Sequence, residues 1–343
     1  MSGDGVRPEL FHAAQAFLVD YLNYKGDEQL IITGDTAGDA AVISALSAAA
    51  VAAGGRPLVI LLPQLPFQGK LADPYLSPVL AAAVKASDVW IDVTFPYIAG
   101  SDMHAQCMAE NHVRYMLASD LSADAMHRLF GRHPLDSYFP LQDALDRKLA
   151  AAVGAPVHIT TPLGTDVRFQ LGKPHSTRPR RAQKPGMYTI PGSCTLNPEI
   201  ESVRGRIVVE TVFHEYYTPL REPISLDVEG RIRTLSGGGA ERDVLDRALR
   251  RAGGDGEYGY IIHFTHGLHP GARFTGRCFV DDMRVPGCDA VGMGLPWWVP
   301  GGGENHPDAV MGQQSIWLDG ELLVDRGRVV QGLFDAALTT RES

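Results

Sequence analysis

Cysteine is scarce in this chain of 343 residues, and its spacing excludes the frameworks that cysteines usually build. No two cysteines form a C-x-x-C pair, so neither a structural zinc knot nor a disulfide scaffold is expected. Scattered thiols are typical of a reducing cytoplasm, which is where we expect the protein to work. The start, Met-Ser-Gly-Asp-Gly, lacks a basic segment followed by an apolar core, so we expect no signal peptide. The four cysteines are Cys107, Cys194, Cys278 and Cys288.

A surplus of basic residues is also missing. Lysine and arginine number 31 against 40 aspartates and glutamates, which gives a formal net charge of −9. Nucleic acids and anionic membranes repel such an acidic surface, so neither is an expected partner. No long apolar run is present either, because Asp39 interrupts the alanine-rich stretch 37–54. We expect a buried helix in that stretch and no membrane span.

The amino-terminal part alternates between strand and helix patterns. Its first predicted strand ends in a G-x-x-x-G turn at 34–38, which is weaker than a dinucleotide fingerprint and predicts an ordinary strand-to-helix turn. Continuous apolar strands separated by helices indicate an α/β domain with a mostly parallel sheet covered on both faces. The predicted strands are 29–33, 58–62, 89–93 and 114–117, and the predicted helices are 10–22, 37–54, 77–86 and 103–111.

From about residue 156 the pattern changes to short β-rich runs separated by glycine or proline. One helix is predicted at 241–251, and the Asp319-Gly320 pair predicts a hairpin turn. These features indicate an α+β domain rich in antiparallel strands. We therefore expect two domains, 1–153 and 154–343, with carboxyl-terminal strands at 157–160, 167–170, 206–210, 231–235, 315–318 and 321–324.

Histidines gather in the carboxyl-terminal half. His263 follows the apolar run 258–262, which predicts a strand that ends beside a loop-lined opening. His306 and Asp308 are two residues apart, so in extended backbone both project to one face and can reach one ion. Pro307 between them restricts the backbone. By itself the H-x-D spacing is weak, and a histidine capping a turn is the alternative.

Two histidines and one carboxylate are the ligand set that suits non-haem iron(II), because this set leaves positions open for oxygen and substrate. Zinc accepts similar ligands, so the residues alone leave the metal open. His214 and Glu215 are another tempting pair, but adjacent residues on a strand face opposite sides. We expect a surface position for that pair.

Several segments together resemble the thermophilic aminopeptidase (aminopeptidase T-like) family, and they imply its fold. That family binds two metals, but three of its ligand positions differ here. Ser193 and His263 replace glutamates, and Ala290 replaces a histidine, whereas the H-x-D of His306 and Asp308 is kept. The resemblance therefore implies one metal in place of two. The matching segments are 164–169, 191–205, 263–273, 275–276, 287–294 and 306–311.

This set of replacements resembles the 2,5-dihydroxypyridine 5,6-dioxygenase family of nicotinic acid breakdown. The resemblance implies one Fe(II) per subunit on His263, His306 and Asp308, with O2 and a small aromatic substrate, a hydroxylated pyridine opened to N-formylmaleamate. One alternative is a metal-dependent aminopeptidase, which needs replacement carboxylates, and Asp289 is the candidate nearby. The other is a non-catalytic relative that binds a small molecule, against which the intact ligand set argues. We also expect a homo-oligomer.

Three further residues are candidates for catalysis. His104 follows a predicted strand and loop at the carboxyl edge of the first sheet, where open α/β sheets place ligands, and an imidazole can act as acid and base. A surface or helix-start position is the alternative for His104. Tyr188 is a candidate hydrogen-bond donor to oxygen or substrate, with core packing as the alternative. Ser193 occupies a former ligand position, so we expect it to face the site.

Four aromatic or histidine residues are candidates for substrate binding. Trp297 and Trp298 could form a wall over a flat ring, although core packing is the alternative. His266 and His269 follow His263 closely, and they either contact substrate or bond to backbone as turn histidines.

Overall fold

The computed structural model describes residues 7–174, 180–213, 216–254, 256–299, 302, 305–330 and 332, so His214 and Glu215 fall outside it. The chain forms two compact units, each assembled from separate segments. The expected division after residue 153 stays a prediction about independently folding domains. Within the described ranges, no helix has both the length and the apolarity to cross a bilayer. Unit 1 is Met1–Leu135, Arg178–Pro191 and Cys278–Asp281, and unit 2 is Asp136–Thr177, Gly192–Arg277 and Asp282–Ser343.

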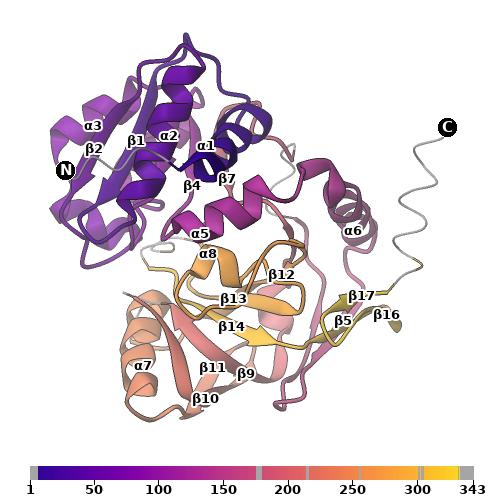
Figure 1. Ribbon diagram of the computed structural model, residues 1–343. Coiled ribbons are helices and arrows are strands. Elements are labelled where there is room, and N and C mark those ends of the chain that lie inside the picture. The colour runs from indigo at the N-terminus through magenta and orange to yellow at the C-terminus, as the bar shows by residue number, and fades with distance from the viewer. Residues whose placement is uncertain are drawn as a thin grey trace. The chain divides into compact units, whose positions relative to one another are not determined.

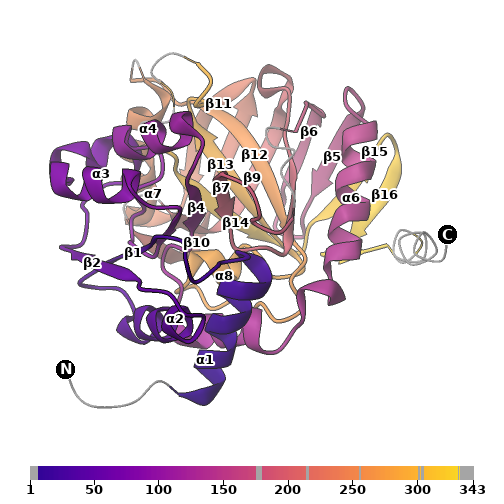
Figure 2. The ribbon, with the colours of Figure 1, turned by 90° about the horizontal axis from the view of Figure 1, so that it is seen from above.

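Unit 1 contains a parallel sheet of five strands in the order β2-β1-β3-β4-β7, as the sequence predicts for its first four strands. Figure 2 shows α3 and α4 on one face of this sheet and α1 and α2 on the other. The fifth strand, β7, comes from a distant segment and was not predicted. The strands are β1 (Leu30–Asp35), β2 (Leu58–Leu62), β3 (Val89–Asp92), β4 (Arg114–Leu117) and β7 (Gly186–Thr189).

The helices of unit 1 begin where side chains can cap their first amides. Ser77 accepts a hydrogen bond from the Leu80 amide, and Pro78 follows in the first turn of the helix predicted at 77–86. Ser101 caps the helix that carries His104. The helices are α1 (Pro8–Gln15, continued by a π-helical turn Ala16–Tyr21), α2 (Ala40–Ala52), α3 (Pro78–Lys85), α4 (Asp102–Glu110), α5 (Ala123–Met126) and α8 (Phe279–Asp282), which ends in unit 2.

Unit 2 is built on one large antiparallel sheet (Figure 1). Strand β10 pairs with both β11 and β9, so the six strands β10-β11-β12-β13-β14-β9 close on themselves. The remaining strands, from β6 to β17, extend the sheet to one side (Figure 2). The closed strands are β9 (Arg204–Phe213), β10 (Tyr217–Glu229), β11 (Arg231–Gly237), β12 (Tyr260–Gly267), β13 (Cys288–Gly294) and β14 (Asp308–Gly312).

The extension ends in the predicted hairpin. Asp319 and Gly320 connect its two strands with positive φ angles of 50° and 80°, as a tight hairpin turn requires. Helices α6 (Phe139–Ala151) and α7 (Gly239–Gly253) complete unit 2. The other strands are β5 (Pro156–Thr160), β6 (Asp166–Gln170), β8 (Ser193–Leu196), β15 (Ser315–Leu318), β16 (Glu321–Asp325) and β17 (Arg328–Val329).

Strands β12, β13 and β14 have one face in the hydrophobic core and one face that carries polar groups. Phe264 and Val291 belong to the core, and side chains alternate along a strand, so their sequence neighbours face the other way. The strand that carries His263 was predicted to end at His263, and this was wrong. It continues to Gly267, with a register shift between Ile261 and His263, so His263 lies within the strand.

Candidate metal centre

Three neighbouring strands bring the predicted ligands together. His263 on β12 pairs with Gly292 on β13, and Gly292 pairs with Asp308 on β14. The side chains of His263 and Asp308 therefore lie on the same face, on the strands to either side of Gly292. His306 lies just before β14, separated from Asp308 by Pro307.

The ligand atoms are close enough to hold one ion. His263 Nε2 lies 3.1 Å from His306 Nε2, and the two nitrogens lie 3.7 and 3.8 Å from Asp308 Oδ1. Three ligands about 2.1 Å from one metal on one face of an octahedron are separated by about 3 Å. The donor set and its spacing therefore fit a single metal ion, and these three form the one such cluster among the described residues.

Burial prepares these groups for a cation. Burial lowers the pKa of His306 to about 4, so its imidazole is neutral at pH 7 and keeps a lone pair for a metal. Burial also raises the pKa of Asp308 well above its usual value, because a charged carboxylate is poorly solvated there. A bound cation would offset that cost. Among the described residues, the ion-pair partners of Asp308 are the two histidines themselves.

Gly292 is a site residue that the sequence analysis missed. A Cβ atom added to Gly292 would lie 2.2 Å from Nε2 of His263, which is far inside contact distance. The backbone of Gly292 does not require glycine for its φ angle, so the reason for glycine is space. A glycine inside a strand often marks close approach of another group, but no strand was predicted at 288–294, so nothing in the sequence singled out Gly292.

Two threonines behind His263 were also missed. The hydroxyl of Thr265 lies 3.1 Å from Nδ1 of His263, and the hydroxyl of Thr195 lies 3.1 Å from that of Thr265. Thr195 stands on β8, directly opposite Thr265 on β12. The H-x-T spacing of His263 and Thr265 could have indicated one of these contacts, but the pairing of β8 with β12 is not visible locally.

The two tryptophans lie beside the metal ligands. The ring of Trp297 is edge-on to the ring of His306, with centroids 6.2 Å apart, and it also packs edge-on against Trp298. Their side chains remain 54% and 45% exposed, so large apolar surface is open next to the ligands. This placement suits the predicted aromatic wall, whose role in substrate binding stays a prediction.

His266 and His269 are buried. Nδ1 of His266 lies 2.8 Å from Asp289 Oδ1, and Gln314 donates to the same oxygen at 2.7 Å. His269 Nδ1 accepts a hydrogen bond from the Gly271 amide, and its ring packs against Tyr138. His266 stands on the core side of β12, whereas His263 stands on the other side, so a substrate contact for either buried histidine stays a prediction.

Ser193 lies farther along β8 than Thr195. It pairs with Gly267, which is four residues from His263 and so about 13 Å along the strand. Its carbonyl accepts a hydrogen bond from the Gln142 side chain. The hydroxyl that connects β8 to the ligands is therefore that of Thr195, and the expected role of Ser193 stays a prediction.

His104 and Tyr188 belong to unit 1. His104 lies in the first turn of α4, where Nδ1 accepts a hydrogen bond from the Gly100 amide and the ring packs edge-on against Tyr115. The Tyr188 hydroxyl donates to the Lys184 carbonyl at 2.9 Å. Their catalytic roles stay predictions.

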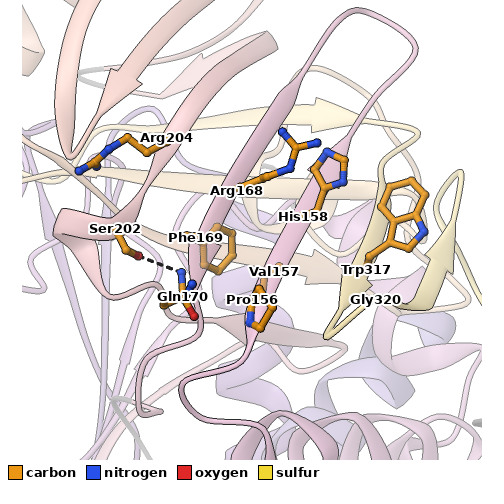
Figure 3. Close-up of a pocket in the computed structure, with 10 residues that line it drawn as sticks. All are labelled: Pro156, Val157, His158, Arg168, Phe169, Gln170, Ser202, Arg204, Trp317 and Gly320. Carbon is orange, nitrogen blue, oxygen red and sulfur yellow. Dashed lines mark hydrogen bonds between the residues drawn. The ribbon is translucent and has the colours of Figure 1, made fainter.

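A pocket of about 540 Å³ lies elsewhere in unit 2, on the sheet extension. Figure 3 shows His158, Arg168 and Trp317 along one side of it, and none of the three metal ligands lines it. His158 is held by Asp166 at 2.8 Å and stacks on Trp317. Since these polar groups bind one another, this pocket offers no catalytic set.

Comparison with known proteins identifies the family. The family model NicX, 2,5-dihydroxypyridine 5,6-dioxygenase, matches residues 19–331. The chain belongs to this family. It is a ring-cleaving dioxygenase, as the ligand replacements predicted. No curated protein matched the sequence in a direct comparison.

Two solved structures share the fold. The 2,5-dihydroxypyridine dioxygenase from Pseudomonas putida KT2440 is 20% identical, with a TM-score of 0.74 over 94% of this chain and 96% of that one. Wild-type AmpT from Thermus thermophilus is 14% identical, with a TM-score of 0.62 over 94% of this chain and 99% of that one. The predicted aminopeptidase T-like fold is therefore confirmed.

Proposed function

We propose that this dioxygenase is an iron(II) enzyme that opens 2,5-dihydroxypyridine to N-formylmaleamate with O2, as a step of nicotinate catabolism. The observation that carries the proposal is the cluster of His263, His306 and Asp308, two neutral donors and one carboxylate within reach of one ion. The family supplies the reaction type, and the ligand chemistry supplies the metal.

The three ligands would hold one Fe(II) per subunit and leave part of its coordination shell open. Bound there, Fe(II) supplies a centre that orients a ring oxygen beside O2 and carries electron density between them. The product contains every atom of the ring plus both atoms of O2, so no further reductant is needed.

Aromatic side chains would bind the flat substrate beside these ligands. Trp297 and Trp298 expose indole surface next to His306, and stacking on an aromatic ring favours a planar ligand. His266 and His269 are the further candidates for substrate contact. A wall on one side of the ring would also exclude water from it.

A base is needed to take a proton from the ring hydroxyl. His104 is our candidate for this acid–base role, with Tyr188 and Ser193 as candidate hydrogen-bond donors. Replacing His104 by Gln should then lower kcat more than metal affinity, whereas Asp308→Asn should strongly weaken metal binding.

The test measures oxygen uptake by anaerobically iron-loaded protein given 2,5-dihydroxypyridine. We expect one O2 consumed per ring lost, followed through the ring absorbance. His306→Ala should abolish uptake, and His158→Ala, a histidine of the same unit outside the ligand cluster, should not. Leucine anilide hydrolysis is measured in parallel with zinc or cobalt. Hydrolysis without oxygen uptake would favour the aminopeptidase alternative, and silence in both assays would favour a non-catalytic relative.

We also propose a cytoplasmic homo-oligomer. All four cysteines are buried and none forms a disulfide bond, which suits a reducing compartment. Light scattering during size-exclusion chromatography would test the assembly, and a monomeric mass would contradict it.

A further inference from the structure

The Nδ1 atom of His263 lies 3.1 Å from the hydroxyl of Thr265, at the position where a carboxylate or backbone carbonyl commonly supports a metal-binding histidine. His263 and Thr265 are two residues apart on β12 and so share one face. Thr195 reaches Thr265 from the neighbouring strand β8. Thr265 is 6% exposed, so its hydroxyl has little access to bulk water.

The chemistry of imidazole fixes the direction of these hydrogen bonds once a metal is bound. A neutral histidine that offers Nε2 to a metal carries its proton on Nδ1, and that N–H must donate. Thr265 is the acceptor within reach, at 3.1 Å. A hydroxyl that accepts still has its own proton to donate, and Thr195 Oγ1 is placed to receive it at 3.1 Å.

A hydroxyl differs from a carboxylate because it can donate a hydrogen bond as well as accept one. Without a metal, Nε2 of His263 can hold the proton and donate to Nε2 of His306, 3.1 Å away. Thr265 would then donate to Nδ1, and Thr195 would donate to Thr265. When the ring proton is on Nε2 instead of Nδ1, rotation of the two hydroxyls adapts the hydrogen bonds to it, so both tautomers of His263 find a partner.

We propose that Thr265, supported by Thr195, is a positioning residue that holds the His263 ring and accepts the Nδ1 proton of its metal-binding tautomer. Gly292 leaves room for the Nε2 end of the ring, and Thr265 holds the opposite end. This inference rests on the proposed metal site but not on the ring-cleaving reaction.

The test measures Co(II) affinity by its visible absorption, in competition with a chelator and without substrate. Thr265→Val keeps the shape of the side chain but removes the hydroxyl, and we expect Kd to rise about 10- to 100-fold. Thr265→Ser should restore affinity to within about 3-fold, because it returns the acceptor. Thr195→Val should weaken binding less than Thr265→Val. Thr234→Val, which removes an exposed hydroxyl of β11 bonded to Asp227, is the matched control and should change nothing.

A second measurement reads the tautomer itself. In Zn(II)-loaded protein with ¹⁵N-labelled histidine, the wild type and Thr265→Ser should show a protonated, hydrogen-bonded Nδ1 on His263. In Thr265→Val the Nδ1 proton should lose its hydrogen-bond shift or exchange rapidly. Circular dichroism and thermal unfolding establish that each variant folds.

The outcomes separate this inference from the proposed function. Equal Co(II) affinity in folded Thr265→Val and wild type would overturn the role of Thr265 and leave the metal site standing. Failure of Thr265→Ser to restore affinity would also overturn it. Failure of the wild-type protein to bind any metal would overturn the proposed function, and this inference with it.

Discussion

Two histidines on strand β12 have opposite surroundings although only two residues separate them. The side chain of His263 is 15% exposed, beside a glycine and an aspartate whose charge is poorly solvated. The side chain of His266 is 1% exposed and bonded to Asp289, which is itself fully buried. Strand β12 therefore carries a partly exposed histidine on one face, called here the open face, and a buried histidine on the other, called the closed face.

The difference is one of burial and of which donor atoms converge. Oδ1 of Asp289 accepts hydrogen bonds from His266 and Gln314, and all three side chains are buried, whereas Oδ2 of Asp289 and Nε2 of His266 have no hydrogen-bond partner among the described residues. On the other face, the ligand atoms of His263, His306 and Asp308 all lie within 4.8 Å of one another. The face of the strand therefore decides whether a histidine and an aspartate lie in the core or next to a second histidine, where three ligand atoms can reach one ion.

Exchanging a carboxylate for an amide on each face should give the largest contrast. Asp308→Asn removes the charged ligand, and we expect Co(II) affinity to fall about 1000-fold. This loss is larger than the loss of about 10- to 100-fold that is typical when a residue hydrogen-bonded to a ligand is replaced. The metal-free variant should be no less stable, because burial disfavours the Asp308 charge. Asp289→Asn should do the reverse, lowering stability and keeping metal affinity. Equal metal loss in both variants would remove the distinction between the two faces.

Gly292 tests the space on the open face. In Gly292→Ala the new Cβ would lie 2.2 Å from His263 Nε2, so the ring must move away from its fellow ligands. We expect metal affinity to fall about 100-fold or more. Gly332→Ala is the control, because nothing lies within 4 Å of a Cβ placed there. Unchanged Co(II) binding in a folded Gly292→Ala protein would show that the site does not depend on this gap.

His266 tests the closed face. In His266→Phe an aromatic ring remains at this position, but Asp289 loses a buried hydrogen-bond donor, so we expect the free energy of unfolding to fall by about 2–3 kcal/mol. Metal affinity should stay within about 3-fold of the wild type. Urea unfolding and Co(II) titration measure the two effects. A variant of normal stability with lost metal binding would instead place His266 in the metal site.

Sequence patterns were enough to predict the elements that depend on residues close together in the chain. The capped helix at Ser77, the Asp319-Gly320 hairpin and the pairing of His306 with Asp308 depend on residues close in sequence. Strand β10 was missed because Pro219 and Pro223 interrupt its pattern, and the structure absorbs them in a register shift.

Features that depend on partner strands could not be predicted. The face of His266 follows from the register shift between Ile261 and His263, which no single strand pattern reveals. The contact of Thr195 with Thr265 needs the pairing of β8 with β12. The need for glycine at position 292 arises from a side chain on the next strand.

The smallest expected effect comes from Cys288, the first residue of β13, which lies four residues before Gly292 and on the same face by alternation. Burial, together with the charges of Asp289, Asp282 and Glu210, raises the pKa of the Cys288 thiol to about 12. The folded state therefore keeps the thiol protonated, whereas the unfolded thiol ionises near pH 9, so stability is intact below pH 9 and is lost as pH rises toward 12.

Urea unfolding at pH 8 and pH 10.5 measures this loss. In the wild type the free energy of unfolding should fall by about 2 kcal/mol more than in Cys288→Ala, which has no thiol to ionise. Cys107→Ala is the matched control for a buried thiol whose raised pKa has Glu110, and not Asp289, as its acidic neighbour. An identical pH dependence in wild type and Cys288→Ala would mean that this end of β13 admits water and that the face is open along its whole length. The space beside His263 would then be shared by the whole of this face of β13 and would not depend on Gly292 alone.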